Sequence, residues 1–391
     1  MSTDRRLTPL LVVVMAVATG VAVASNYYPQ PLLPTIARAF GLSPAGAGFI
    51  VTTAQLGYGL GLLLIVPLGD LLERRRLIVG MSLLTAGGLF TTALAPAQGL
   101  LLAGTFLTGL FSVVVQVLVP FAATLAAPEE RGKVVGTVMS GLLLGILLAR
   151  TVAGALAQLG SWRIVYWVGG AAMILVAAVL GRALPRHQEP AGLSYPALMR
   201  SVFALFREEP VLRLRSLLGA CSFAAFSVLW TSMGFLLAAP PYGYSPGLIG
   251  LFGLAGVAGA LAASAAGRLG DRGQGQRVTG WCLVLLLVSW AVLGFAGRSL
   301  VALVAGILLL DLSSQAVHIS NQNAIYRIRP EARSRLTAGY MTSYFIGGAA
   351  GSLVSAAAYG HARWLGVVGA GFLVSALGLV TWLVAGRRLN G

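Results

Sequence analysis

Charged residues are scarce in this chain: they make up 10% of its 391 residues, whereas 57% are hydrophobic. Soluble domains carry about 25% charged residues, so this composition excludes a soluble enzyme and a disordered protein. Cysteine is also scarce, because Cys221 and Cys282 are the only two, and both lie in apolar stretches. That excludes a disulfide scaffold, and the two thiols suggest no metal site. Glycine is abundant at 51 residues, which favours helices packed closely in membrane lipid.

Long apolar runs indicate an integral membrane protein. Although the net charge is +16, the basic residues are spread between apolar runs along the whole chain, so no nucleic-acid partner is expected. Each run is close to the 20 or so residues that cross the hydrocarbon. The first run resembles a signal peptide, but the runs that follow favour a transmembrane helix. Twelve helices are predicted near residues 8–28, 46–69, 77–96, 99–125, 135–159, 163–184, 213–238, 246–269, 278–297, 299–325, 336–358 and 364–386.

The basic residues predict the orientation of these helices. If both termini are cytoplasmic, the cytoplasmic segments hold 22 of the 27 basic residues. Cytoplasmic loops carry an excess of lysine and arginine, so we expect both termini in the cytoplasm of a multi-pass inner-membrane protein.

The chain contains an internal repeat. Landmarks recur at an offset of 201 or 202 residues: Asp70 and Asp271, Pro128-Glu129 and Pro330-Glu331, Trp162 and Trp364. We therefore predict two pseudo-symmetric six-helix bundles, residues 1–185 and 213–391, with a cavity between them. The linker, residues 186–212, places apolar residues on one face of a short amphipathic helix on the inner membrane surface. A simple tether is the alternative.

Two loops carry a family resemblance. The loops after the second and eighth predicted helices read LGDLLERRR (68–76) and GRLGDR (267–272). They resemble the first cytoplasmic signature of the major facilitator superfamily, and with the twelve helices this likeness covers the whole chain. The segments NYYPQPLLP and HISNQN resemble the bacterial drug and sugar efflux branch of proton antiporters.

The resemblance implies the major facilitator fold and a gating role for the two loops. An aspartate at Asp70 can face the positive N-terminus of the eleventh helix, with basic residues such as Arg74 beside it. Asp271 and Arg272 are the matching pair in the second half. Such a contact exists only while the two halves touch on the inner side, so it would favour the outward-open state.

One acidic residue among eleven falls inside a predicted span. Asp311 lies about 12 residues into its helix, roughly 18 Å deep, where an aspartate costs on the order of 3 kcal/mol. Gln315, His318 and Gln322 follow on the same helical face. We predict that this stripe lines the substrate path, with Asp311 and His318 coupling protons. Polar residues that only hold helices together are the alternative.

Arg150 is a basic residue inside a predicted span and keeps its proton. Three alternatives remain open: a pair with Asp311, a site for an anionic substrate group, or a side chain that snorkels to the outer face. Further substrate-binding candidates are Asn26 and Tyr27 near the outer end of the first helix, Gln116 as the repeat counterpart of His318, and Trp230 in the seventh helix.

These observations predict a secondary active transporter that moves a small organic molecule across the inner membrane by proton-coupled alternating access. The resemblance implies export by antiport, and proton-linked uptake by symport is the alternative. The first helix lacks an acid, so neutral or anionic substrates are favoured over dications. No phosphate-binding loop is recognised, so neither ATP nor a cofactor is expected. An intramembrane enzyme is disfavoured, because no nucleophile–base constellation or metal-ligand cluster is present. We expect a monomer.

Overall fold

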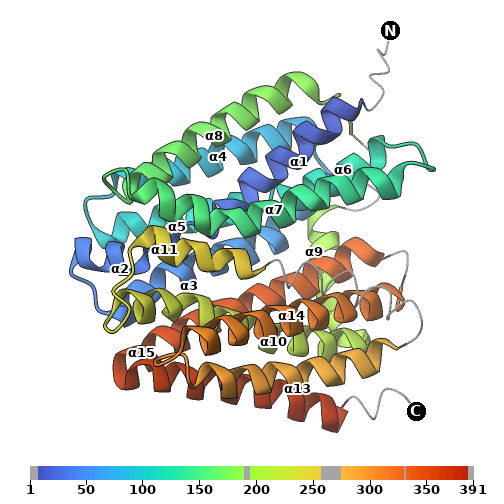
Figure 1. Cartoon of the computed structure of the whole chain (residues 1–391). Helices are drawn as coiled ribbons and strands as arrows, with labels where there is room; N and C mark the ends of the chain where they lie inside the picture. Colours follow the sequence, from blue (N-terminus) through green and yellow to red (C-terminus); the bar gives the residue numbers. More distant parts are fainter. Residues whose placement is uncertain (1–7, 189–193, 257–273, 330–331, 386–391) are drawn as a thin grey trace.

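The computed structural model describes residues 8–188, 194–256, 274–329 and 332–385 (Figure 1). Within these ranges the chain forms helices and loops and no strand, which confirms the prediction of an all-helical membrane protein. The elements are α1 (Pro9–Ala24), α2 (Pro29–Phe40), α3 (Pro44–Leu64), η1 (Val66–Asp70), α4 (Arg74–Leu94), α5 (Gln98–Ser112), α6 (Val115–Leu125), α7 (Arg131–Ala157), α8 (Arg163–Ala183), α9 (Tyr195–Glu208), α10 (Pro210–Ala238), α11 (Pro246–Leu251), η2 (Phe252–Gly256), α13 (Gly275–Leu293), α14 (Leu300–Tyr326) and α15 (Arg333–Ala385).

Ten helical segments of the described chain are long and apolar enough to cross a membrane. The last, α15, runs for 53 residues and contains two predicted spans, because Ala362 and Arg363 leave helical geometry between them. The eighth predicted span begins with α11 and η2, and the rest of it lies outside the described residues. Helices therefore occupy eleven of the twelve predicted positions, and part of the twelfth.

The first span is longer than the predicted 8–28, and it is broken partway along. After α1 the chain turns through residues 25–28, and α2 then continues to Phe40. Pro29 suits the first turn of a new helix, and its missing N–H prevents a continuation of α1. Asn26 and Tyr27 therefore lie at an internal break, which corrects the prediction that they lie near the outer end of the span.

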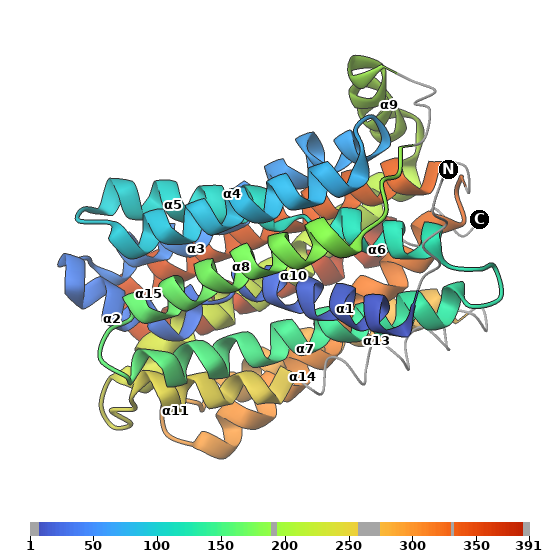
Figure 2. The ribbon, with the colours of Figure 1, turned by 90° about the horizontal axis from the view of Figure 1, so that it is seen from above.

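The helices pack mainly within two groups. In the first, α1 packs against α7, α3 against α5, and α4 against α5 and α8; in the second, α10 packs against α14 and α15, and α13 against α14. The two groups meet where α3 contacts α15, α7 contacts α11 and α2 contacts α10. Figure 2 shows α2 at one end of the bundle, here called the α2 end, and α9 at the opposite end, the α9 end.

Small residues set the spacing of α1 and α7. A Cβ atom on Gly141 would lie 2.1 Å from the carbonyl oxygen of Ala16, and one on Gly145 would lie 2.3 Å from that of Gly20. No side chain fits at these distances, so the two backbones are in direct contact. This packing fixes α7, which carries Arg150, against the break in the first span.

Helix α9 touches both groups at the α9 end. The Tyr195 hydroxyl donates a hydrogen bond to the carbonyl oxygen of Leu64, at the end of α3, over 2.8 Å. At the other end of α9, Glu208 and Glu209 form ion pairs of 3.0 and 2.7 Å with Arg329, which follows α14. The connecting segment thus holds the ends of α3 and α14 through polar contacts.

Candidate functional site

Arg150 lies in the interface between the two helix groups, with 2% of its surface exposed. Its Nε–H donates to the Oε1 atom of Gln30 in α2 over 2.5 Å. Aromatic rings surround the guanidinium carbon, at 3.7 Å from the ring centroid of Trp230, 5.1 Å from Tyr27 and 5.6 Å from Phe226. A desolvated cation over an aromatic face gains about 2 kcal/mol or more, so these rings compensate for part of the lost hydration.

Trp230 connects Arg150 to Asp311. The Trp230 indole N–H donates to the Oδ1 atom of Asp311 over 3.2 Å, while the ring of Trp230 stacks on the guanidinium. Asp311 is 3% exposed, so this hydrogen bond partly replaces the water that a carboxylate needs. The cluster therefore runs from Gln30 through Arg150 and Trp230 to Asp311, and it crosses from the first helix group to the second.

This geometry bears on the three alternatives for Arg150. The side chain does not snorkel to the outer face, because it is buried. Among the described residues no ion pair joins Arg150 to Asp311; the face of the Trp230 ring contacts the guanidinium, and the N–H at the edge of the same ring contacts the carboxylate. A buried charge without a direct counter-ion is costly, so a site for an anionic substrate group stays a prediction that is compatible with these contacts.

One nitrogen of Arg150 has no partner. Its Nη2 atom is buried and makes no hydrogen bond. Arg150 borders a small space with no room for a water molecule, which is lined by Gln30, Pro31, Arg150, Trp230, Met233 and Ile249. Helices α11 and η2 approach the backbone of α7 at Arg150 because Gly250 and Gly253 carry no side chain. A Cβ atom on Gly253 would lie 2.9 Å from the Cβ of Arg150.

The polar stripe on α14 divides into two parts. Asp311 belongs to the cluster with Trp230, whereas His318 contacts α15, where its Nδ1 atom lies 3.0 Å from the hydroxyl of Tyr340. The ring of His318 also lies 4.6 Å from that of Tyr344. Gln315 and Gln322 are half-buried, and Gln322 approaches the sulfur of Met341 at 4.0 Å.

The remaining candidates in the spans have separate surroundings. Tyr27 stands at the guanidinium of Arg150, whereas the neighbouring Asn26 is buried and its Oδ1 atom has no partner. Gln116, at the start of α6, forms a hydrogen bond with Tyr58 of α3. The structure thus gathers Tyr27, Trp230, Arg150 and Asp311, and it places Asn26 and Gln116 outside this cluster.

Two of the candidate gating residues, Asp70 and Arg74, lie near the α9 end. Asp70 ends η1, and Arg74 begins α4. Arg74 is buried, with its Nε–H donating to the carbonyl oxygen of Gly69 over 3.3 Å and its Nη1 to the hydroxyl of Thr124 over 2.9 Å. Arg74 therefore connects the loop after the second span to Thr124 of α6, within the first helix group. Asp271 and Arg272 lie outside the described residues.

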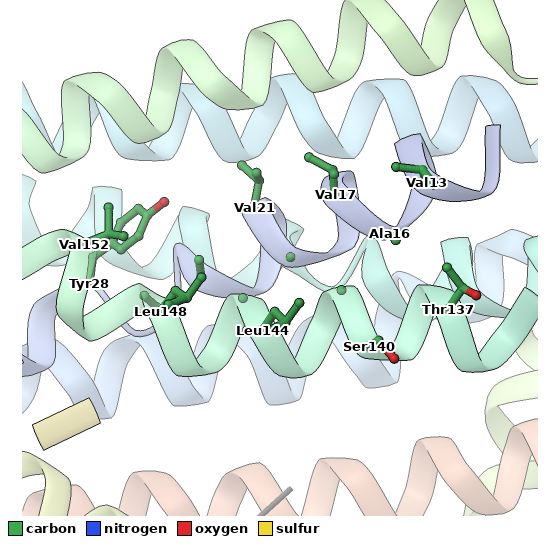
Figure 3. A pocket seen from close by; sticks show the side chains of 15 residues that line it. Val13, Ala16, Val17, Val21, Tyr28, Thr137, Ser140, Leu144, Leu148 and Val152 are labelled. Carbon is green, nitrogen blue, oxygen red and sulfur yellow. The ribbon is translucent and has the colours of Figure 1, made fainter. Parts of the chain in front are cut away.

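A larger groove lies elsewhere, between α1 and α7 (Figure 3). Its volume is about 480 Å³, and its lining is almost entirely apolar. Val13, Val17 and Leu144 of this lining are exposed, and none of the predicted site residues belongs to it. In a membrane we expect lipid to contact this groove. We therefore treat the groove as distinct from the charged cluster around Arg150.

The sequence analysis missed two residues of the polar interior. Phe226, which packs over Arg150, gave no signal, because an aromatic residue in an apolar run usually marks ordinary packing. Arg215 was counted only among the basic residues of the cytoplasmic segments, but it is 4% exposed and lies in the polar interior. Its Nη1 donates to the hydroxyl of Thr279 over 3.1 Å and to the Oδ1 of Asn321 over 3.2 Å. Its position one turn inside α10 was the available signal.

Comparisons with known proteins agree with this architecture. The family model described as Major Facilitator Superfamily matches residues 15–273 and 215–390. "Uncharacterized transporter YgaY" of Escherichia coli O157:H7 is 60% identical over 379 residues, covering 97% of this chain and 96% of that protein. "Probable transporter SCO4007" of Streptomyces coelicolor (strain ATCC BAA-471 / A3(2) / M145) is 33% identical over 364 residues, covering 92% of this chain and 83% of that protein.

A solved structure shows the same fold. A bacterial homolog of the human lysosomal transporter Spinster, in an inward-facing and occupied conformation, superposes with a TM-score of 0.80. The alignment covers 97% of this chain and 96% of that chain, at 16% sequence identity. At this identity the likeness establishes the helix arrangement and leaves the substrate open.

Proposed function

Because the chain belongs to the major facilitator superfamily and is a membrane transporter rather than an enzyme, we propose that it moves a small organic molecule by proton-coupled alternating access. Two halves, residues 1–185 and 213–391, rock about a central site, and residues 186–212 link them. The protein works as a monomer in the bacterial inner membrane, with both termini in the cytoplasm.

The charged cluster between the halves is the observation that carries this proposal. Gln30 and Arg150 come from the first half, and Trp230 and Asp311 from the second. The contact at 3.7 Å between Arg150 and Trp230 crosses the interface, so a rocking motion has to change it. Ionisable groups inside a membrane mark ion and substrate pathways, and these two change their surroundings when the halves move.

In this proposal Asp311 carries the coupled proton. When the halves separate on one side, water reaches the carboxylate and a proton can exchange with that side. His318 lies two turns along the same helix with Tyr340 as its partner, and it serves as the relay between Asp311 and the α9 end. Gln315 and Gln322, on the same face, contribute hydrogen bonds to the substrate, together with Asn26, Tyr27, Gln116 and Trp230.

Gating is assigned to the two ends of the bundle. At the α2 end, the Thr151 hydroxyl donates to the carbonyl oxygen of Gly250 over 3.0 Å, and the Gln158 amide donates to the hydroxyl of Ser245 over 2.8 Å. These bonds join α7 to α11 and its preceding loop, so they break when this end opens. At the α9 end we assign the corresponding role to Asp70 and Arg74, with Asp271 and Arg272 as their repeat counterparts.

Two directions of coupling use the same cluster. The resemblance to the efflux branch favours export by antiport, in which the proton and the substrate occupy the site in turn. The unpartnered Nη2 of Arg150 favours the second candidate, symport, because an anion bound there is best accommodated when Asp311 holds a proton. The sign of the proton flux distinguishes the two.

The test measures the pH inside liposomes that contain the purified protein. Organic anions, cations and neutral compounds of similar size are added outside, and an internal dye reports the lumen pH. A substrate that enters with a proton acidifies the lumen, whereas a substrate that enters in exchange for a proton makes it alkaline. Substrate uptake without any pH change would contradict the proton coupling proposed here.

Asp311→Asn is the matched control, because it keeps the size of the side chain and removes the titration. We expect this variant to lose the pH response and gradient-driven accumulation, while exchange of labelled for unlabelled substrate continues. Protein-free liposomes correct for weak acids that cross the lipid in their neutral form. Accumulation by Asp311→Asn at the wild-type level would remove Asp311 from the coupling step.

A further inference from the structure

The Nη2 atom of Arg150 is a hydrogen-bond donor without an acceptor in the middle of the protein. The residue is 2% exposed, and the atom has no partner. A buried donor left unsatisfied costs about 1–3 kcal/mol, and more when it is charged. The neighbouring space is lined mostly by apolar and aromatic groups, and Gln30 already accepts from Nε. An anion would be the strongest acceptor for this donor, because the donor is positively charged.

From this arrangement we propose that the substrate is an organic anion, a carboxylate attached to a flat apolar group, and that it binds together with a proton. The inference rests on the proposed function and specifies its substrate class. A guanidinium binds a carboxylate through two parallel N–H bonds. The rings of Tyr27, Phe226 and Trp230, which now cover the guanidinium, provide stacking surfaces for the flat group when the halves part.

Charge balance links the anion to the proton. Without substrate, the positive charge of Arg150 is balanced by Asp311 across the ring of Trp230. A bound carboxylate adds a second negative charge, and neutrality returns when Asp311 takes up a proton. Each ligand therefore strengthens the binding of the other by the same factor. Two ligands that bind together also cross together, which makes the coupling symport.

The neighbouring titratable groups support this assignment to Asp311. Among the described residues, those that face it are Arg150 of α7, Tyr27 at the break between α1 and α2, and Tyr344 of α15. His318 lies on the same helix and contacts Tyr340 and Tyr344. None of these groups adds a negative charge at neutral pH. A bound anion therefore meets one other anionic group, and that is Asp311.

The first experiment compares three probes that share a phenyl ring and a three-carbon chain: 3-phenylpropionate, 3-phenylpropanamide and 3-phenylpropylammonium. Their binding to purified full-length protein is measured by isothermal titration. We expect the carboxylate to bind at least roughly tenfold more tightly than the amide, because only the carboxylate satisfies the charged donor. Equal binding of the amide, tighter binding of the ammonium, or binding of none of the three would overturn the proposal.

Variants locate this preference. Arg150→Gln is expected to bind the carboxylate and the amide equally. Arg150→Lys should keep part of the preference for the carboxylate, because the positive charge remains while the paired N–H donors of the guanidinium are lost. Arg38→Gln, which removes an exposed arginine of α2, is the matched control and should behave as wild type. A preference for the carboxylate that survives in Arg150→Gln would place the anion elsewhere and refute the assignment.

The pH dependence tests the link to the proton and does not require a variant at Arg150. In the wild type, affinity for 3-phenylpropionate should fall by about tenfold per pH unit once Asp311 is ionised. Asp311→Asn should bind the probe with an affinity that does not change with pH. Affinity that stays constant in the wild type, or falls equally in both proteins, would refute joint binding.

Liposome transport separates this inference from the proposed function. If an ammonium or amide probe moves with an Asp311-dependent proton flux, the proposed function stands and the substrate class is wrong. If 3-phenylpropionate binds through Arg150 and crosses without proton flux, the substrate class stands and the coupling is wrong. Acidification of the lumen on entry of 3-phenylpropionate, beyond that of protein-free liposomes, supports both.

Discussion

The contact between α7 and α11 at the α2 end predicts the effect of a single methyl group. A Cβ atom on Gly154 would lie 2.4 Å from the carbonyl oxygen of Pro246, about 1 Å closer than ordinary van der Waals contact. Gly154→Ala therefore has to separate α7 from α11 by about that distance. The same movement lengthens the bond between Thr151 and Gly250, now 3.0 Å, beyond hydrogen-bonding range.

The magnitude follows from these two changes. Overpacking costs about 1–3 kcal/mol, and a lost hydrogen bond costs about 1 kcal/mol. Both penalties apply only while the α2 end is closed. Together they amount to about 2–4 kcal/mol, and the lower value of about 2 kcal/mol already shifts the population toward states that are open at this end by roughly 30-fold.

The assay measures access to the space beside Arg150. Ile249 is 3% exposed and lines this space, so Ile249→Cys, with Cys221 and Cys282 replaced by serine, reports opening through its reaction with a hydrophilic maleimide. We expect Gly154→Ala to raise the labelling rate roughly 30-fold, in proportion to the open population.

A matched control lies on the same helix. Gly136 of α7 has open space where a Cβ would stand, so Gly136→Ala should leave the labelling rate unchanged. If Gly154→Ala reacts at the same rate as Gly136→Ala, the α7–α11 contact does not hold the α2 end closed, and the gating role of this contact would be refuted.

Three further outcomes follow from the site and the loops. Trp230→Phe keeps an aromatic ring beside Arg150 and removes the N–H that donates to Asp311; we expect substrate affinity to change less than about tenfold, while the pH profile of transport moves to higher pH. Asp70→Asn should lower turnover more than binding and shift the protein toward the inward-open state, as measured by labelling of cysteines placed in the cavity; unchanged labelling would contradict this. Tyr195→Phe removes the bond from α9 to Leu64 and should speed hydrogen–deuterium exchange of the α9 amides without lowering substrate affinity; unchanged exchange would show that this bond does not hold α9.

Hydropathy was sufficient to predict most of the fold. Helix placement in lipid depends on the length and apolarity of each run, and both are local properties, so eleven of twelve predicted positions are helical in the described chain. The break after α1 and the interruption between α5 and α6 are exceptions. A hydropathy profile does not show that a new helix begins at Pro29, because Pro29, Pro31 and Pro34 do not interrupt the apolar run.

The same locality explains which site residues the sequence could identify. Asp311 and Arg150 were recognisable because a charge inside an apolar run is costly wherever it lies in the fold. Trp230 was also named as a candidate, but which residues pair with the two charges was not predictable in this way. Gln30 is 120 residues from Arg150, and Trp230 is 81 residues from Asp311, and no periodic pattern relates such positions.

The amino-acid sequence by itself thus determined that the chain spans a membrane many times, that its two halves repeat, and that two charges lie inside the spans. The tertiary structure alone decided that Trp230 contacts both charges, that Arg150 keeps an unpartnered nitrogen, and that Arg215 is buried. The physical reason is that burial in lipid acts on each segment separately, whereas the partner of a buried polar group depends on how distant helices pack together.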